Sequence, residues 1–336
     1  MPDRPSLLHP PVHPPEHSPP QPPRALRVAA FGECMLELQG PPFGAPGELR
    51  MGQGGDTLNA AVYLARCGQR HGLQVEYATA LGDDRFSAAM AERWRAEGVG
   101  TALLQLLPGR LPGLYWIETD ARGERHFSYW RDRAAVRSYF DGPSGTTPLE
   151  AAADTLDALH FSGISLAILP PPGRERLLAV AHTVRDRGGV VSYDNNHRPR
   201  LWETVDAAQA AAAAALRVAT LALMTLEDEQ ALWSLPDADA ALKRTLALPV
   251  PEVVVKRGAH STLVRTAEGA VREVATAQGV QVVDSTAAGD SFAGAYLAAR
   301  LGGADAARSA AAGNRLAARV VQHRGALIPR EAMADL

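Results

Sequence analysis

Short apolar runs alternate along this chain with stretches in which apolar residues recur at every third or fourth position. Such runs are typical of buried strands, and the recurrence is typical of helices that pack on a sheet through one face. Because helices separate successive strands, we expect an open α/β sheet of parallel strands with right-handed crossovers. The pattern predicts strands at residues 27–38, 75–81, 158–162, 190–194, 220–224 and 252–256, helices at 58–68, 85–98, 173–187, 203–218, 237–247, 288–301 and 304–322, and a hairpin at 261–265 and 271–274.

Residues 103–133 interrupt this alternation. No helix separates the short apolar runs of this region, and the runs are mixed in polarity. Together with residues 36–52 the region predicts a small β-rich lid outside the main sheet. Its strands are predicted at 103–107, 113–119 and 125–130, the last two joined by the turn Asp120–Gly123.

The first 24 residues differ from the rest of the chain. Met1–Arg24 is rich in proline and includes His9, His13 and His17. This composition does not form a packed core, so a disordered or polyproline-like tail is predicted. The three histidines could bind a metal weakly, but a solvated tail is the simpler interpretation.

Charge and cysteine content limit the classes of protein to which this chain can belong. The 34 basic and 37 acidic residues give a net charge of -3 and form no basic run, which argues against nucleic acid or an anionic membrane surface as a partner. No apolar run reaches the ~18–20 residues of a membrane span, and the N-terminal stretch has no apolar segment for a signal peptide. Cys34 and Cys67 are too few for a disulfide scaffold. A cytoplasmic location is therefore expected.

The segment Asp284–Asp290 combines small residues with two acids near the C-terminal end. Val280, Val282 and Val283 before it predict a short buried strand, and the apolar stripe after it predicts a helix. The turn between them would present free helix N-terminal amides to an anion. Asp290 in the first helical turn could accept a hydroxyl proton, as phosphoryl transfer to an alcohol requires. A purely structural turn is the competing interpretation.

Polar clusters follow several other predicted strands, at the edge where open α/β sheets bind ligands. The glycines of Gly54–Asn59 would let a hydroxylated ligand approach the backbone while Asp56 and Asn59 bind its hydroxyls. Lys256-Arg257-Gly258 is either a nucleotide-binding loop or a charged strand exit with a tight turn. Structural caps and turns would also explain both segments.

Two arginines in these clusters suit a carboxylate. Arg131 shares a face of its predicted lid strand with Tyr129, and Tyr115 on the neighbouring strand can join them. Arg198 lies in the donor-rich segment 194–200, and its guanidinium can clamp a carboxylate or a phosphate. Cross-strand packing would explain the tyrosines, and a solvated loop would explain the segment.

Several common nucleotide-binding classes are excluded by missing motifs. The chain has no Gly-x-x-x-x-Gly-Lys-[Ser/Thr] loop and no His-Arg-Asp and Asp-Phe-Gly pair, so it is neither a P-loop enzyme nor a protein kinase. No Gly-x-Gly-x-x-Gly follows the first strand, which weighs against a dinucleotide oxidoreductase.

Two segments resemble the signatures of the ribokinase-like (PfkB) carbohydrate kinases. Asp284–Phe292 resembles the C-terminal signature and Gly54–Val62 the N-terminal one, in the order that the family has. The resemblance covers residues 27–330. Within the family, the segments most similar to kinases of 2-keto-3-deoxygluconate are 32–37, 129–131, 162–167, 194–202 and 322–329.

This resemblance implies a fold and an activity. The fold would be a three-layer α/β/α domain over residues 25–336, with a mainly parallel central sheet and a β-rich lid of residues 36–52 and 103–133, through which relatives often form dimers. The activity would be the ATP-dependent phosphorylation, supported by Mg²⁺, of the terminal hydroxyl of 2-dehydro-3-deoxy-D-gluconate. The partners would be a sugar acid, ATP and a second copy of the chain.

The resemblance also assigns roles to single residues. It makes Asp290 the general base, which we expect to be ionised and weakly basic because it lies at a helix N-terminus. The anion hole would be the backbone of Ala287, Ala288, Gly289 and Asp290. The sugar acid would be held by Gly55, Asp56, Asn59, Tyr115, Tyr129, Arg131 and Arg198, and ATP by Lys256, Arg257, Gly258 and Gly289.

One departure from the family pattern concerns the metal. Many relatives have Asn-x-x-Glu near Mg²⁺ and phosphate, whereas this chain has Thr225 and Asp228 at those positions. Asp228 is therefore expected to support Mg²⁺ only through water.

The identity of the acceptor stays open. A kinase of the same fold could instead phosphorylate fructose, ribose or a deoxy sugar acid from inositol breakdown. A non-catalytic sugar or nucleotide sensor is a further alternative, which the presence of Asp290 disfavours.

Overall fold

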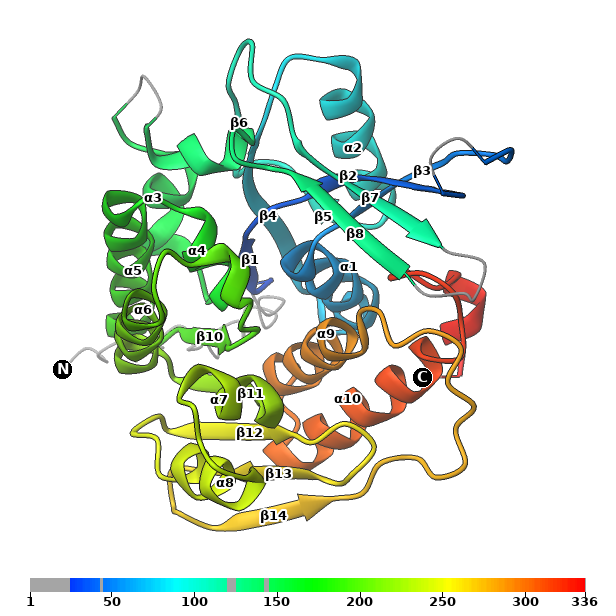
Figure 1. The fold of residues 1–336 in the computed structure, drawn as a ribbon. Helices are drawn as coiled ribbons and strands as arrows, with labels where there is room; N and C mark the ends of the chain where they lie inside the picture. Colours follow the sequence, from blue (N-terminus) through cyan, green and yellow to red (C-terminus); the bar gives the residue numbers. More distant parts are fainter. Residues whose placement is uncertain (1–24, 43–44, 120–124, 142–144, 336) are drawn as a thin grey trace, which may run out of the picture.

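The computed structural model describes residues 25–335 apart from 43–44, 120–124 and 142–144. The predicted proline-rich tail, residues 1–24, and the predicted turn Asp120–Gly123 lie outside the described residues. In the described part, helices lie on both faces of a central sheet, and a smaller sheet stands beside it (Figure 1).

The central sheet contains the strands predicted from the apolar runs, except that the predicted strand 27–38 divides: Arg27–Phe31 lies in this sheet and Met35–Gly40 lies in the smaller one. Its order is β14-β13-β12-β11-β10-β9-β1-β4-β5, and β6 also pairs with β4. The pairs from β12 to β5 are parallel, and the predicted hairpin adds β13 and β14 as antiparallel strands at one edge. The strands are β1 (Arg27–Phe31), β4 (Gln74–Leu81), β5 (Val99–Gly100), β6 (Leu104–Leu106), β9 (Ala158–Ser162), β10 (Val190–Asp194), β11 (Leu221–Thr225), β12 (Glu252–Lys256), β13 (Thr262–Arg265) and β14 (Val271–Val274).

Helices cover both faces because the side chains of each strand alternate between them. In β1, Val28 and Ala30 pack on the face that α1, α2, α9 and α10 cover, whereas Ala29 and Phe31 pack on the face of α4–α8. The predicted three-layer architecture is therefore confirmed. The helices are α1 (Asp56–Gly68), α2 (Arg85–Ala96), α3 (Pro148–Ala152), α4 (Gly163–Ile168), α5 (Pro171–Asp186), α6 (Val205–Val218), α7 (Leu226–Leu232), α8 (Ala238–Leu246), α9 (Ala288–Leu301) and α10 (Ala306–Val320).

The smaller sheet, called the lid below, has the order β3-β2-β7-β8. One expectation about it is wrong, because the strand predicted at 103–107 does not belong to it. That strand, β6, pairs in parallel with β4 in the central sheet, since its flanking residues Leu103 and Leu107 are buried in the main core. The lid strands are β2 (Met35–Gly40), β3 (Arg50–Gly54), β7 (Gly113–Thr119) and β8 (Arg125–Trp130).

The buried strand predicted at Val280–Val283 is also wrong. These residues form an irregular segment, and the side chains of Val282 and Val283 are exposed. The amides of Val283 and Asp284 donate to the carbonyl of Val321, just beyond α10, at 2.8 and 3.1 Å. Their hydrogen bonds are thus satisfied by a helix end, so the valines need no neighbouring strand.

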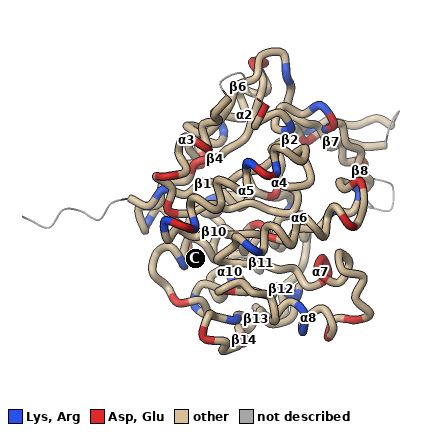
Figure 2. The backbone as a smooth tube through the Cα atoms, turned by 90° about the vertical axis from the view of Figure 1, so that its left-hand side faces the viewer, with Lys and Arg blue, Asp and Glu red and all other residues tan. Residues whose placement is uncertain are grey.

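Charge on the surface follows the near balance of the sequence. In Figure 2 acidic and basic residues are interspersed over the elements that face the viewer, with no large region of one sign. Among the described residues, no helix combines the length and apolar character needed to cross a membrane.

Helices α1 and α9 pack closely along their length on one face of the central sheet (Figure 1). Gly294 permits this approach, because a Cβ atom there would lie 2.7 Å from the carbonyl oxygen of Ala60 and 2.8 Å from the amide nitrogen of Leu64. Both neighbours are backbone atoms of α1, so they cannot rotate away. The spacing of the two helices therefore depends on this glycine.

We expect Gly294→Ala to lower the free energy of unfolding by about 1–3 kcal/mol, because the added methyl forces the two helices apart. Thermal or urea unfolding measures the change. Gly173→Ala in α5 is the matched control, since a Cβ there would come no closer than 3.3 Å to a side-chain carbon. Equal stability of the Gly294 variant and the wild type would contradict the close-packing account.

Candidate active site

The two signature turns lie at the N-termini of α1 and α9, and a hydrogen bond joins them. Asn59 Nδ2, in the first turns of α1, donates to Asp290 Oδ2, in the first turn of α9, at 2.8 Å. The contact spans 231 positions of sequence. The glycine turn near residue 55 and the small-residue turn near residue 290 therefore open onto the same region, as predicted.

Asp284 holds the small-residue turn in shape. Its Oδ1 accepts hydrogen bonds from the amide and the hydroxyl of Thr286 at 3.0 and 2.7 Å, and its Oδ2 accepts one from the amide of Gly325 at 2.9 Å. The carboxylate thus ties the turn to the segment that follows α10. Its role in the signature is to shape the backbone that precedes α9.

The entry into α9 is a compact backbone turn. Ala287 has a left-handed conformation with φ of 61°, and its carbonyl accepts the amide of Ser291. The amide of Ala288 donates to the carbonyl of Ser285 at 3.3 Å. Within the predicted anion hole, the amides of Gly289 and Asp290 have no acceptor inside the helix, because they lie in its first turn. They and the helix dipole favour an anion there.

Asp290 is a stronger base than its position at a helix N-terminus suggests. Burial and the negative charge of Asp56 raise the pKa of Asp290 to about 7, and the hydrogen bond from Asn59 lowers it in part. The expectation that Asp290 is weakly basic is therefore wrong, because removal from water outweighs the helix dipole. A carboxylate with a pKa near neutrality suits a general base at neutral pH.

Asp56 is held by two side chains that the sequence did not identify as a pair. Its Oδ2 accepts hydrogen bonds from Ser162 Oγ at 2.6 Å and from Asn196 Nδ2 at 2.7 Å. Asn196 has a strained backbone with φ of 24°, which indicates that its position is fixed by its surroundings. The end of β9 and the segment after β10 thus converge on the carboxylate of Asp56, which follows the lid strand β3.

Arg131 is paired with an internal acid. Its guanidinium donates to Glu33, which follows β1, and both side chains are buried. Glu33 Oε1 and Arg131 Nε are buried without a partner among the described residues. Burial raises the pKa of Glu33, and Arg131 opposes this shift. The pair leaves a donor and an acceptor unused, so a ligand with complementary groups would satisfy both.

The two lid tyrosines face the same side as these groups but differ in exposure. The hydroxyl of Tyr115 donates to Glu37, and its ring lies 5.9 Å from that of Tyr129. The side chain of Tyr129 is half exposed and lies against the guanidinium of Arg131. Tyr115 thus has a fixed internal partner, whereas Tyr129 remains accessible to a ligand.

Arg198 and Asp228 lie side by side after β10 and β11. The shortest distance between their charged atoms is 3.6 Å. Asp228 also accepts the amide of His197 at 3.1 Å, and burial raises its pKa. Arg198 keeps a half-exposed side chain, so its guanidinium can still reach a ligand.

The three residues predicted to lie along ATP divide into two groups. Lys256 is buried, and its Nζ donates to Asp194 Oδ2 at 2.6 Å. Arg257 instead donates to the carbonyl of Ser261 and pairs with Glu273, so it stabilises the hairpin. Gly258 has φ of 58° and forms the tight turn before β13. The structural interpretation thus fits Arg257, and Lys256 alone points inward.

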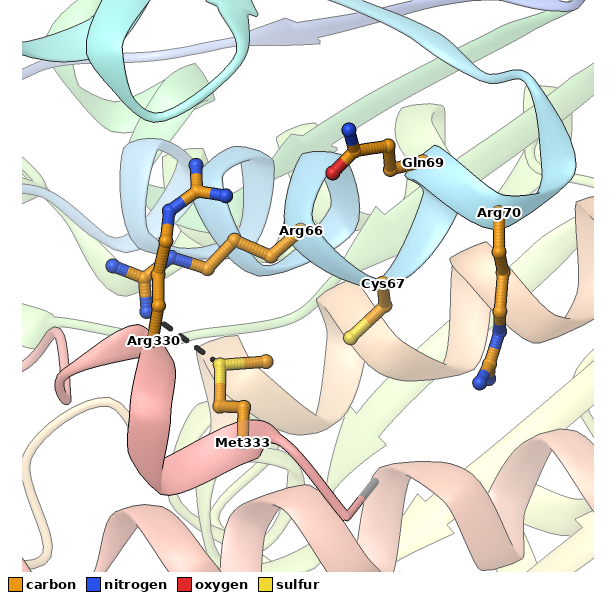
Figure 3. A pocket seen from close by; sticks show the side chains of 6 residues that line it. All are labelled: Arg66, Cys67, Gln69, Arg70, Arg330 and Met333. Atoms are coloured by element: carbon orange, nitrogen blue, oxygen red, sulfur yellow. Dashed lines mark hydrogen bonds between the residues drawn. The ribbon is translucent and has the colours of Figure 1, made fainter.

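A hollow of about 390 Å³ lies at the opposite end of α1 (Figure 3). Arg66 in this hollow donates to both carboxylate oxygens of Glu97 at 2.8 and 2.9 Å and to the carbonyl of Ile328. Arg330 pairs with the same carboxylate at 3.2 Å. These contacts attach the C-terminal segment to α1 and α2. None of the predicted site residues lines this hollow.

The pfkB family carbohydrate kinase model matches residues 25–333. The chain belongs to the PfkB family of carbohydrate kinases. A 2-dehydro-3-deoxygluconokinase from Dickeya dadantii is 47% identical over 91% of this chain and 98% of its own length. A fructokinase from Vibrio alginolyticus is 28% identical over 73% of this chain and 75% of its own length.

Solved structures of this family show the same architecture. A protein from E. coli described as a ribokinase II, solved in complex with ATP and Mg²⁺, superposes with a TM-score of 0.76 at 25% identity. The match covers 90% of this chain and 94% of that one. The ribokinase-like fold, with its central sheet and small lid sheet, is therefore confirmed.

Some members of this PfkB site were not assigned a role from sequence alone. They are Glu33, Glu37, Ser162, Asp194 and Asn196, which pair with predicted residues. Four of them follow or end a predicted strand, so their position at the ligand edge was visible, whereas Glu37 lies in the predicted lid. The partners of these five residues could not be predicted, because no spacing rule links segments so far apart in the sequence.

The pKa of Asp290 provides a test of this geometry. In its predicted role as the general base Asp290 acts as a carboxylate, so kcat/KM is expected to rise with pH through about 7. The hydrogen bond from Asn59 favours the charged form, so Asn59→Ala raises the pKa and moves this acidic limb to higher pH. A pH profile of kcat/KM measures the shift.

Cys67→Ala on the same helix is the control and should leave the limb in place, because Cys67 lies at the far end of α1 beside the hollow. A limb that does not move in Asn59→Ala, or a wild-type limb near the usual carboxyl range, would contradict the account of Asp290.

Proposed function

We propose that this PfkB kinase transfers the γ-phosphoryl group of ATP to the terminal hydroxyl of 2-dehydro-3-deoxy-D-gluconate. The observation that carries the proposal is the Asn59–Asp290 contact, which brings a carboxylate with a pKa of about 7 and an anion-binding helix N-terminus to the sugar-binding turn. The relative that is 47% identical over 91% of the chain is named for this activity.

Asp290 would act as the general base. It accepts the proton of the terminal hydroxyl as that oxygen attacks the γ-phosphorus, while the bond from phosphorus to the leaving ADP oxygen breaks. The amides of Gly289 and Asp290 would bind the oxygens of the transferred group, where negative charge must be stabilised. Positioning and charge neutralisation then contribute most of the rate.

The sugar acid would lie between α1 and the lid. Arg131 and Arg198 would bind its carboxylate, and the unused Arg131 Nε supports this role. Asp56 and the backbone of Gly55 would bind its hydroxyls, and Tyr129 would cover it from the lid. Asn59 supports this site indirectly, because its amide group already donates to Asp290.

Mg²⁺ would accompany ATP. Among the described residues, no three His, Cys, Asp or Glu side chains form a group that could hold a metal ion. The ion would be carried chiefly by phosphate oxygens and water. Asp228, whose carboxylate already accepts an amide and lies near Arg198, would contact that hydration shell. When bound, the ion neutralises phosphate charge.

A kinase for a neutral sugar is the second candidate. A fructokinase is among the relatives, at 28% identity, and the fold alone does not separate the acceptors. The two arginines at the site favour the sugar acid, because a guanidinium can bind a carboxylate through two parallel hydrogen bonds and a neutral sugar has no such group.

The experiment is a phosphorylation panel with ATP and Mg²⁺. It compares 2-dehydro-3-deoxy-D-gluconate with fructose, ribose and a deoxy sugar acid of inositol breakdown, using wild type and Asp290→Asn. The gluconate derivative is expected to have the highest kcat/KM. Asp290→Asn should lose at least about 10²-fold in turnover, because general-base help is typically worth that much, while ATP still binds.

A neutral sugar that reacts as well as the sugar acid would contradict the acceptor. Near-normal turnover of Asp290→Asn would remove that residue from the role of base. Circular dichroism verifies that the wild type and Asp290→Asn are both folded before their activities are compared.

We further propose that the chain forms a homodimer through the lid in the cytoplasm. Phe127 and Trp130 of β8 expose large apolar side chains on opposite faces of that strand. Phe127→Glu with Trp130→Glu should shift the sedimentation coefficient from dimer to monomer, whereas Val205→Glu, an exposed apolar residue of α6, should not. A monomeric wild type would contradict the dimer.

The free thiols of Cys34 and Cys67 support the cytoplasmic location.

A further inference from the structure

Glu33 lies between the predicted sugar-binding turn and Arg131. It follows β1, its side chain is 2% exposed, and its carboxylate accepts a hydrogen bond from Nη2 of Arg131, which is 9% exposed. Its backbone packs against the turn, because a Cβ atom on Gly55 would lie 2.1 Å from the carbonyl oxygen of Glu33. One buried acid thus contacts both the turn and an arginine that we assign to the sugar acid.

The Glu33–Arg131 pair is enclosed but leaves hydrogen-bonding groups unused. Gly113, the first residue of β7, packs against it from the lid, since a Cβ atom there would lie 2.6 Å from Glu33 Oε1. Oε1 of Glu33 and Nε of Arg131 are buried, and neither has a hydrogen-bond partner among the described residues. A proton added at Oε1 would therefore displace no hydrogen bond, and a carboxylate that reaches Nε would gain a donor.

The charge of Glu33 depends on its surroundings. Burial raises its pKa most, and the positive charge of Arg131 lowers it in part. The arginine is therefore the main group that keeps this buried acid ionised. The other titratable groups that interact with Glu33 come from several elements and are Arg137 in the helical turn 135–141, which favours the ionised form, Asp56 in α1, which opposes it, and Cys34 and Tyr77, whose own pKa values burial raises well above the ordinary range.

A carboxylate bound to Arg131 would change this balance. The guanidinium would then be shared between two negative charges, and a second negative charge close by raises the pKa of a carboxyl group. The interaction is strong at this position because Glu33 is removed from water. A proton that restores the balance has a vacant acceptor in Oε1.

We propose that Glu33 is the positioning residue of Arg131 and that it takes up a proton from solvent when the carboxylate of a sugar acid binds to this arginine. This inference rests on the proposed function. The proton bonds to Oε1, Oε2 keeps the hydrogen bond from Nη2, and Arg131 stays protonated. In the empty site Glu33 neutralises the arginine and holds it in place, and in the occupied site the sugar acid supplies that negative charge. A neutral sugar brings no charge to Arg131, so it leaves Glu33 ionised.

A purely structural ion pair leads to different expectations. If Glu33 only holds Arg131 in place, Glu33→Gln weakens the binding of the sugar acid at every pH. If Glu33 takes up a proton, the neutral glutamine resembles the protonated acid. Glu33→Gln then binds the sugar acid at least as tightly as the parent protein does at low pH, and its affinity does not change with pH.

The experiment is a calorimetric titration of Asp290→Asn with 2-dehydro-3-deoxy-D-gluconate. This variant is the parent protein because Asp290 is another group at the site that titrates near neutrality, with a pKa of about 7. Titrations in two buffers of different ionisation enthalpy give the number of protons exchanged. We expect uptake that approaches about one proton per sugar acid, and a Kd that rises with pH by up to about 10-fold per unit, the limit for one linked proton.

Glu33→Gln in the same parent should abolish the uptake and the pH dependence of Kd. Glu97→Gln is the matched control, because it weakens another Arg–Glu pair, beside the hollow of Figure 3, and should leave both unchanged. The uptake itself is measured on the parent protein, so the test does not depend on the folding of Glu33→Gln.

Binding of the sugar acid without proton uptake, or equal uptake in the parent and in Glu33→Gln, would overturn the proposal. Either result would leave the acceptor in place. Failure of the sugar acid to bind at all would contradict the acceptor and this inference together, so the two failures are distinguishable.

Discussion

The hydrogen bond between Asn59 and Asp290 joins the two halves of this kinase. It connects the first turns of α1 and α9, which lie 231 positions apart in the chain. The contact is possible because Gly294 has no side chain. A Cβ atom at this position of α9 would touch the backbone of α1. Glycine packing in the core thus determines where Asp290, the proposed base, lies relative to the proposed sugar site near Gly55.

Burial together with the crowding of like charges sets the basicity of Asp290 at this site. Burial raises the pKa of Asp290 most, the negative charges of Asp56 and Asp194 raise it further, and Asn59 and Lys256 oppose these effects. The native state therefore holds three carboxylates near one another, which is costly unless cations or hydrogen bonds offset it. Burial is the larger source of the pKa of about 7 for Asp290, and this repulsion adds to it. A site with fewer acids would contain a weaker base.

Periodicity and glycine turns in the sequence were sufficient to predict most of the fold. The strands at 158–162, 190–194 and 252–256 have the predicted bounds, because continuous apolar runs are required where both faces of a parallel sheet are covered. The valines at 280–283 show the limit of the rule, since their apolar character gave no sign that a helix end would bind the backbone.

The residues of the site were predicted more reliably than their partners. Asp290 and Arg131 were named from their motifs, but the sequence could not show that Asn59 holds the first and Glu33 the second. Such pairs depend on how distant strands and helices converge. The raised pKa of Asp290 could not be predicted for the same reason, because it arises from burial and from neighbours elsewhere in the chain.

A crystal structure of the wild-type chain with a non-hydrolysable ATP analogue and 2-dehydro-3-deoxy-D-gluconate tests the central claim most directly. We predict that the terminal hydroxyl of the sugar acid lies within about 2.6–3.2 Å of the Asp290 carboxylate, with the terminal phosphate at the N-terminus of α9. A sugar acid bound away from the turn near Gly55, with its terminal hydroxyl beyond the reach of Asp290, would contradict the account.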